Sequence, residues 1–215
     1  YRRDSEGDLH DLLQWARQHQ IRFTVRLVKG AYWDSEGIWA RQNNWPVPVF
    51  LNKPETDANF EKLAQIILKH RDQTRLACAS HNLRAIAYVV EAGKDRRTAP
   101  EEVEYQVIYG MGEPIRNALQ QAGLPVRVYA PIGEMLQGMA YLVRRLLENT
   151  ANESFLRQGF AQGLAIDQLL RSPLEILEES PGSPALEQDS EAFGGRGPFR
   201  NEPLWDWTLA EHRER

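Results

Sequence analysis

The sequence predicts an α/β fold with a parallel sheet, and three observations support this prediction. Short β-like segments alternate with amphipathic helical patterns from the start of the chain to about residue 150. Each β-like segment ends in glycine, proline or polar residues, where a strand would pass into a loop. Each helical pattern carries apolar residues three or four positions apart. Alternation of this kind is typical of parallel strands that are joined by helical crossovers.

The candidate strands are rich in apolar, β-branched and aromatic residues, and they span residues 22–29, 75–80, 104–109 and 126–130. Between the first two, Pro46, Pro48 and Pro54 predict an irregular segment over residues 35–56. Asp57 is then expected to be the N-cap of the next helix. Four such units are half of the eight in a TIM barrel, but four strands also suffice for a small open α/β sheet. Periodicity alone leaves both architectures open.

Composition narrows the class of protein. Charged residues make up 26% of the 215 residues and the net charge is −4, which argues against a basic nucleic-acid-binding face. No apolar run approaches the roughly 20 residues of a membrane span, and the first residues do not form a signal peptide. Cys78 is the only cysteine, so we expect no internal disulfide, no metal site and a cytoplasmic location.

The composition changes near residue 165. Residues 172–200 contain four prolines and four glycines among serine and acidic residues, without an apolar period. This predicts a globular region over residues 1–171, a linker over residues 172–198 and the start of another domain over residues 199–215. Because the chain begins at Tyr1 without an initiator methionine, we expect it to be a fragment of a longer protein.

In parallel α/β folds, ligands bind at the carboxyl ends of the strands. Those positions here are glycine-rich, aromatic and polar: residues 29–33, 80–82, 109–112 and 129–131. Glycine lets a flat or phosphorylated ligand approach the backbone, although each glycine alone is more simply a turn residue. Arg26 lies on the opposite strand face from Val25 and Leu27, so it predicts either an anion contact or an outward ion pair. His81 predicts a hydrogen bond to a ligand or a structural role in the loop.

Two adjacent arginines, Arg144 and Arg145, follow a helical pattern and precede Glu148. Two guanidinium groups can bind a carboxylate in bidentate geometry, with the glutamate orienting one of them. Considered on its own, however, the pattern favours a solvated surface ion pair.

Several motifs resemble one known family. Residues 25–34 (VRLVKGAYWD), 79–82 (ASHN), 110–114 (GMGEP), 128–131 (VYAP) and 141–150 (YLVRRLLENT) resemble bacterial proline dehydrogenases, in family order. Residues 199–204 (FRNEPL) resemble the entry to the aldehyde dehydrogenase domain of bifunctional proline utilization enzymes. The resemblance implies the C-terminal half of a distorted (β/α)8 TIM-like barrel that holds FAD, followed by a linker.

The resemblance also implies an activity, which is FAD-dependent oxidation of L-proline to 1-pyrroline-5-carboxylate. The implied partners are a membrane quinone as electron acceptor, the missing N-terminal half-barrel and a C-terminal aldehyde dehydrogenase domain that uses NAD. Contact with the inner membrane surface would then be peripheral. The fragment itself is expected to be inactive. The alternatives are a non-catalytic barrel fragment without flavin and, more weakly, a barrel enzyme that acts on a phosphorylated substrate.

Roles are implied residue by residue. The implied cofactor-binding residues are Arg26, Val28, Gly30, Ala31, Trp33, His81, Asn82 and Gln106. The implied substrate-binding residues are Leu27, Tyr32, Ile108, Tyr129, Arg144, Arg145 and Glu148. Among them, Tyr129, Arg144 and Arg145 are the implied catalytic residues, because they would hold the ring and the carboxylate of proline. At residues 51–53 (LNK) the chain departs from the family's usual Thr-Arg-Lys run, so cofactor contacts there stay undefined.

Overall fold

The computed structural model describes residues 1–43, 45–150 and 166–179, and for residues 137, 145–150 and 166 it describes the backbone alone. Its centre is a four-stranded sheet in the order β1-β2-β3-β4, and every neighbouring pair is parallel. The strands are β1 (Phe23–Leu27), β2 (Thr74–Ala79), β3 (Val103–Ile108) and β4 (Val126–Tyr129). The predicted parallel α/β fold is therefore confirmed.

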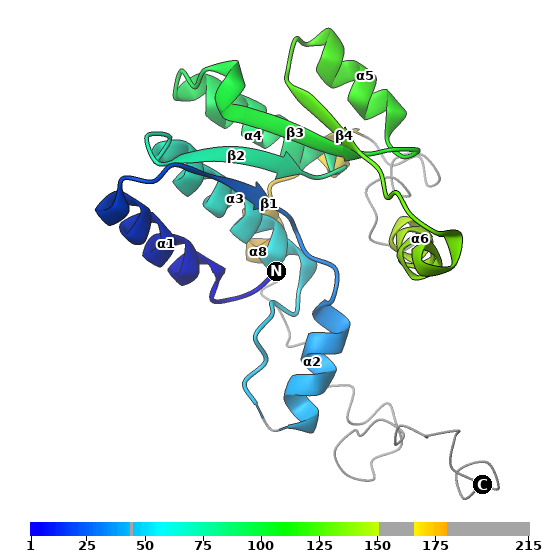
Figure 1. The fold of residues 1–215 in the computed structure, drawn as a ribbon. Coiled ribbons are helices and arrows are strands. Elements are labelled where there is room, and N and C mark those ends of the chain that lie inside the picture. Colours follow the sequence, from blue (N-terminus) through cyan, green and yellow to red (C-terminus); the bar gives the residue numbers. More distant parts are fainter. Residues whose placement is uncertain (44, 151–165, 180–215) are drawn as a thin grey trace, which may run out of the picture.

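Helices connect the strands and cover one face of the sheet (Figure 1). They are α1 (Ser5–His19), α2 (Trp33–Gln42), α3 (Lys53–Lys69), α4 (Leu83–Asp95), the 3-10 helix η1 (Pro100–Glu102), α5 (Glu113–Gln121), α6 (Met135–Thr150), α7 (Ile166–Leu169) and α8 (Pro173–Glu179). Helices α2 and α6 lie beyond the carboxyl ends of the strands (Figure 1). In the described part of the chain the sheet is open, with β1 and β4 at its edges.

The core lies between the sheet and helices α1, α3, α4 and α5. Alternate residues of each strand point into it because side chains alternate between the two faces of a sheet. Leu76 and Val107 are each only 1% exposed, and they belong to the same core cluster as Phe60 and Ile67 of α3. Thr74, a polar strand residue in this layer, donates to the carbonyl oxygens of Ile67 and His70, which satisfies its buried hydroxyl.

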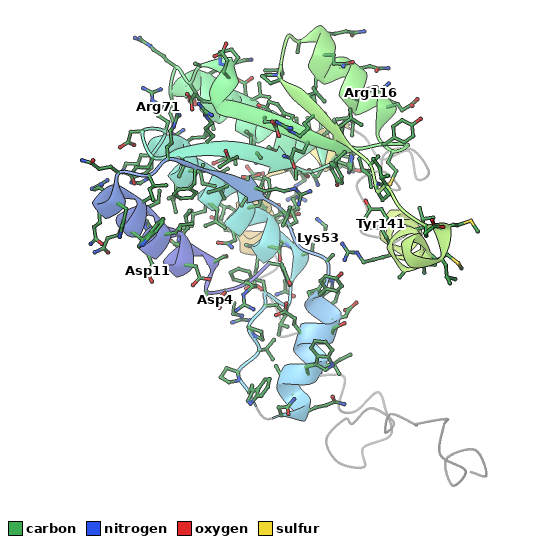
Figure 2. The ribbon with its side chains drawn as sticks, viewed as in Figure 1. Asp4, Asp11, Lys53, Arg71, Arg116 and Tyr141 are labelled. Carbon is green, nitrogen blue, oxygen red and sulfur yellow. The ribbon has the colours of Figure 1, made fainter. Side chains whose placement is uncertain are left out.

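Charged side chains occupy the outer surface, as Asp11 of α1, Arg71 of the turn between α3 and β2, and Arg116 of α5 show in Figure 2. Among the described residues, no helix combines the length and the apolar character that crossing a membrane would need.

The segment between β1 and α3 differs from the prediction. Residues 33–42 form helix α2 rather than irregular structure, because Pro46 and Pro48 come after the end of that helix. Asp57 is not the N-cap of α3. The cap is Asn52, whose side chain pairs reciprocally with Glu55 in a capping box, while Pro54 occupies the first turn, where proline is tolerated.

The predicted linker is wrong over its first residues, since residues 173–179 form α8, which packs against α3. The backbone N–H of Ser172 donates to Glu175 Oε2 at 3.3 Å, which closes the first turn, and Pro173 is buried. The rest of the predicted linker, residues 180–198, and the predicted start of another domain, residues 199–215, lie outside the described residues.

Candidate functional site

The sheet face opposite the core carries a group of polar side chains. Arg26 projects from it, and its Nε donates to Gln106 Oε1 at 2.7 Å across the intervening strand β2. Arg26 pairs in register with Ala77, and Gln106 pairs with Ala79. Because both β2 residues are alanines, the long arginine side chain can pass over them. We call this surface the open face of the sheet.

Tyr129 completes the group from β4. Its ring centroid lies 5.4 Å from the guanidinium carbon of Arg26, within the range of a cation–π contact. Ile108 pairs with Tyr129 in register, and it is only 3% exposed. The structure therefore brings together four predicted residues, Arg26, Gln106, Ile108 and Tyr129, on the open face near the carboxyl ends of the strands.

His81, just after β2, connects the ends of β2 and β3 through a hydrogen bond. Its Nε2 accepts the backbone N–H of Ile108 at 3.2 Å, so the ring proton of the neutral imidazole is on Nδ1. Gly112 lies directly against this ring: a Cβ at Gly112 would come within 2.8 Å of His81 Cδ2. Gly112 also has a φ of +65°, which favours glycine. The glycine-rich loop after β3 is thus shaped around His81.

The segment after β1 is exposed at several predicted cofactor-binding positions. Val28 and Trp33 are 39% and 42% exposed, and Ala31 is also exposed. Gly30 has a φ of +93°, and the ring of Tyr1 lies where a Cβ would be. A side chain at position 30 would therefore be strained and would also clash.

Arg144 of α6 contacts the end of β1 through Tyr32. The guanidinium carbon lies 4.5 Å from the centroid of the Tyr32 ring, and Nη1 donates to the tyrosine hydroxyl. Its Nε is buried and has no hydrogen-bond partner among the residues that the structure describes. Arg145 and Glu148 belong to the same helix, but their side chains are not described.

A charged cluster lies beside the segment that follows β1, and the sequence analysis did not predict it. Asp57 of α3 forms ion pairs of 2.6 Å with both Lys29 and Lys53. Burial by itself would raise the pKa of Asp57, but the charges of the two lysines outweigh it and lower that pKa. Burial also lowers the pKa of Lys29, and Asp57 opposes this effect.

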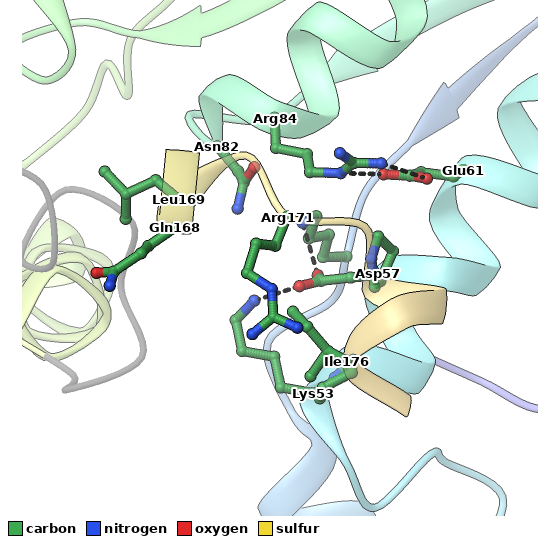
Figure 3. A pocket seen from close by; sticks show the side chains of 12 residues that line it. Lys53, Asp57, Glu61, Asn82, Arg84, Gln168, Leu169, Arg171 and Ile176 are labelled. Atoms are coloured by element: carbon green, nitrogen blue, oxygen red, sulfur yellow. Dashed lines mark hydrogen bonds and ion pairs between the residues drawn. The ribbon is translucent and has the colours of Figure 1, made fainter. Parts of the chain in front are cut away.

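The two lysines border two pockets. A pocket of about 160 Å³ is lined by Gly30, Trp33 and Lys53 among others. A second pocket, of about 290 Å³, extends from Lys53 and Asp57 to Asn82 and to Arg171, which precedes α8 (Figure 3). Both pockets thus combine cationic side chains with the strand ends.

Asn82 and Arg84, which line the second pocket, also stabilise the start of α4. Asn82 Oδ1 accepts the backbone N–H of Ala85 at 3.0 Å, so this residue is the N-cap of α4. Arg84 Nε donates to Glu61 Oε1 at 3.0 Å, and this pair lines the second pocket (Figure 3). Asn82 therefore has a structural role, and its implied cofactor contact stays a prediction.

Leu27 is not at this site. It is only 7% exposed and packs in the core cluster beneath the helices, because it alternates with Arg26 along β1. The structure thus gives Leu27 a core role, and the substrate contact implied for it stays a prediction. Conversely, Lys53, Asp57 and Arg171 border the pockets but were not assigned to the site from the sequence, since the folding of α3 and α8 brings them beside Lys29.

Comparisons with known proteins agree on one family. The proline dehydrogenase family model matches residues 1–158. The chain is 37% identical to Bifunctional protein PutA of Rhizobium meliloti over 175 residues, which are 79% of this chain and 14% of that protein. It is 32% identical to Proline dehydrogenase 2 of Bacillus subtilis over 158 residues, which are 74% of this chain and 46% of that protein.

A solved structure gives the same result. Proline utilization A from Bdellovibrio bacteriovorus, inactivated by N-propargylglycine, superimposes with a TM-score of 0.82 at 44% identity and covers 100% of this chain and 22% of that chain. The chain thus spans less than half the length of these relatives. With the family model matching most of the chain, and with relatives above 30% identity, the chain belongs to the proline dehydrogenase family.

Proposed function

We propose that this chain supplies four of the eight strands of an FAD-dependent proline dehydrogenase barrel within a longer bifunctional protein. The observation that carries the proposal is the open face, where Arg26 is held by Gln106 and stacks near Tyr129 at the carboxyl ends of parallel strands. A cation, an amide and an aromatic ring at this edge suit a flat, polar cofactor and a small substrate.

The residues at the end of β1 fit such a cofactor. Gly30 adopts a φ that favours glycine, Trp33 offers an exposed ring, and Lys53 adds positive charge beside the smaller pocket. FAD would be held by residues that the family resemblance names: Arg26, Val28, Gly30, Ala31, Trp33, His81, Asn82 and Gln106. When bound, FAD supplies the two-electron acceptor for the oxidation, and the protein provides orientation and electrostatics.

The substrate would be bound between the open face and α6. Arg144 already lies against Tyr32, and its buried Nε, which has no hydrogen-bond partner within the described part of the chain, is a donor that a carboxylate could satisfy. Arg145 would add a second charged contact, and Glu148 would orient the pair. Tyr129 and Ile108 would form an apolar wall for the proline ring, holding C5 toward the cofactor and excluding water.

The wider assignments follow from the relatives' descriptions and from the resemblance. The product would be 1-pyrroline-5-carboxylate, formed by loss of a hydride from C5 and a proton from nitrogen of L-proline. A membrane quinone would reoxidise the enzyme during peripheral contact with the membrane. An NAD-dependent aldehyde dehydrogenase domain of the same longer protein would oxidise the product further.

A second candidate is a non-catalytic fragment that binds no flavin. It is favoured by the open sheet, because β1 and β4 are edge strands in the described residues. Flavin absorbance of the purified 215-residue chain distinguishes a fragment that binds flavin from one that does not. A colourless chain would support the fragment as inactive by itself.

The substrate assignment is tested in the proposed longer protein. Arg144→Met and Arg145→Met should each raise the KM for proline roughly 10- to 150-fold, the equivalent of about 1.5–3 kcal/mol for one charge-assisted hydrogen bond. Flavin content should stay near that of the parent. Arg116→Met, an arginine on the outer surface of α5, is the matched control and should leave KM unchanged. Unchanged KM values for both site variants would contradict the assignment.

A further inference from the structure

One carboxylate on the open face has no assigned role. Glu104 lies on β3, two residues before Gln106, so both side chains project from the same face of the strand. Glu104 Oε1 accepts a hydrogen bond from Gln106 Nε2 at 2.7 Å. Arg127 of β4 donates to both oxygens of Glu104, through Nε at 2.7 Å and Nη2 at 2.6 Å. Glu104 therefore lies between an arginine on one strand and an amide on its own strand.

These bonds determine how the Gln106 amide is turned. An ionised carboxylate only accepts hydrogen bonds, so Gln106 must present its NH2 group to Glu104. Its oxygen then faces the other way, and this oxygen accepts Arg26 Nε at 2.7 Å. If the amide turned over, its NH2 group would face the guanidinium, and two donors would oppose each other. Glu104 thus selects the amide orientation that can hold Arg26.

The bidentate contact with Arg127 favours the ionised form of Glu104, which is the form that accepts the hydrogen bond from Gln106. The hydrogen bonds from Arg127, followed by the one from Gln106, lower the pKa of Glu104 below its ordinary value of 4.5. The carboxylate is therefore ionised at neutral pH. The resulting series, Arg127, Glu104, Gln106 and Arg26, crosses the open face from β4 to β1.

We propose that Glu104 is a positioning residue for the flavin site: acting through Gln106, it aims the Arg26 guanidinium toward the bound cofactor. The proposal rests on the function proposed above, in which Arg26 contacts FAD. In this role Glu104 acts without contacting the cofactor or the substrate, since its hydrogen bonds go to Gln106 and Arg127. Its effect on the flavin is transmitted by one amide, so the effect depends on that amide being present.

The test measures FAD affinity of the apo form of the proposed longer protein by flavin fluorescence, together with the midpoint potential of the bound flavin. Glu104→Gln should raise the Kd for FAD about tenfold, the size expected for one misdirected hydrogen-bonding group. Gln106→Ala should weaken binding to a similar extent. The double variant should be no weaker than Gln106→Ala, because the two residues act as one unit.

The matched control is Glu102→Gln. Glu102 is a nearby glutamate that also pairs with arginines, Arg22 and Arg75, but has no contact with Gln106. It should leave the Kd and the potential unchanged. If Glu104→Gln does not fold, Glu104→Asp replaces it, since the shorter side chain keeps the charge but loses the reach to Gln106.

The outcomes separate the two proposals. A Kd and a potential for Glu104→Gln that match those of Glu102→Gln, or additive losses in the double variant, would overturn the positioning role. Unchanged FAD affinity in Arg26→Met would instead overturn the flavin contact on which the proposed function rests.

Discussion

The two faces of the sheet differ in polarity and in side-chain hydrogen bonding, although the same four strands form both. The helix-covered face consists of apolar residues such as Leu76 and Val107, each 1% exposed. The open face carries Arg26, Glu104 and Gln106, which are linked by hydrogen bonds of 2.7 Å. Alternation along each strand thus separates the residues that stabilise the fold from those that form the site.

Strand β2 shows how the faces depend on each other. Its core-facing residues Leu76 and Cys78 fill space beneath the helices, whereas Ala77 and Ala79 on the other face leave space. That space lets Arg26 reach Gln106, and Ala77 is consequently only 1% exposed. Small residues on the open face are therefore part of the site.

The largest expected effect is on the core face. Leu76→Ala should lower the free energy of unfolding by about 2–5 kcal/mol, because it leaves a cavity in the centre of the sheet–helix core. Urea unfolding of the 215-residue chain measures this change. Val128→Ala, at a residue 41% exposed, is the control and should shift the midpoint much less. Equal shifts would show that the core is not where we place it.

Asp57→Asn should have the next largest effect, about 1.5–3 kcal/mol, because it removes the charge between Lys29 and Lys53. The folded-state pKa of Asp57 is lowered, so its stabilisation is complete well above the ordinary value of 3.8 and is lost as pH falls through the folded-state pKa. The difference between parent and variant should therefore shrink in acid. Glu91→Gln, which breaks an exposed pair with Lys94, should show neither effect.

Arg127→Met should change stability little, because the arginine is 66% exposed and surface ion pairs contribute little. The same variant should weaken FAD binding in the longer protein, since Glu104 loses its anchor. Unfolding curves and flavin titrations on the same preparation check both results. A strongly destabilised variant would mean that the open face also stabilises the fold.

The smallest expected effect is the reaction of Cys78 with an alkylating reagent. Burial raises the pKa of this thiol to about 12, and the side chain is 1% exposed, so neither thiolate nor access is available near neutral pH. Mass spectrometry should find no adduct on the folded chain and one adduct in denaturant. Rapid labelling without denaturant would contradict tight packing of the core face.

The strands could be predicted well because alternation and terminal glycines are local signals. Helix α2 could not, because the nearby prolines suggested irregular structure although they follow the helix. Helix α8 was hidden by linker-like composition, yet Ser172, Pro173 and Glu175 form a recognisable helix start. Both helices thus had local sequence signals, but the prolines near α2 and the linker-like composition around α8 favoured irregular structure.

Only part of the site's arrangement could be predicted from the sequence. Arg26, Gln106 and Tyr129 come together as their strand positions imply, and Arg144 meets Tyr32. Strand alternation places Leu27 in the core, and the substrate contact that the resemblance implies for it stays a prediction. The ion pair of Asp57 with Lys53 is an i,i+4 pair within α3 and could have been predicted from the spacing. The ion pair of Asp57 with Lys29 depends on how α3 folds back beside β1, and no local pattern encodes that contact.

Two adjacent residues, Arg26 and Leu27, test the central claim most directly, because they lie on opposite faces of β1. FAD affinity and urea unfolding should be measured for Arg26→Met and Leu27→Ala in the proposed longer protein. The account predicts that Arg26→Met weakens FAD binding with little change in stability. It predicts that Leu27→Ala lowers stability by about 2–5 kcal/mol while the folded protein binds FAD normally. Weakened FAD binding in Leu27→Ala, together with normal binding in Arg26→Met, would contradict the account.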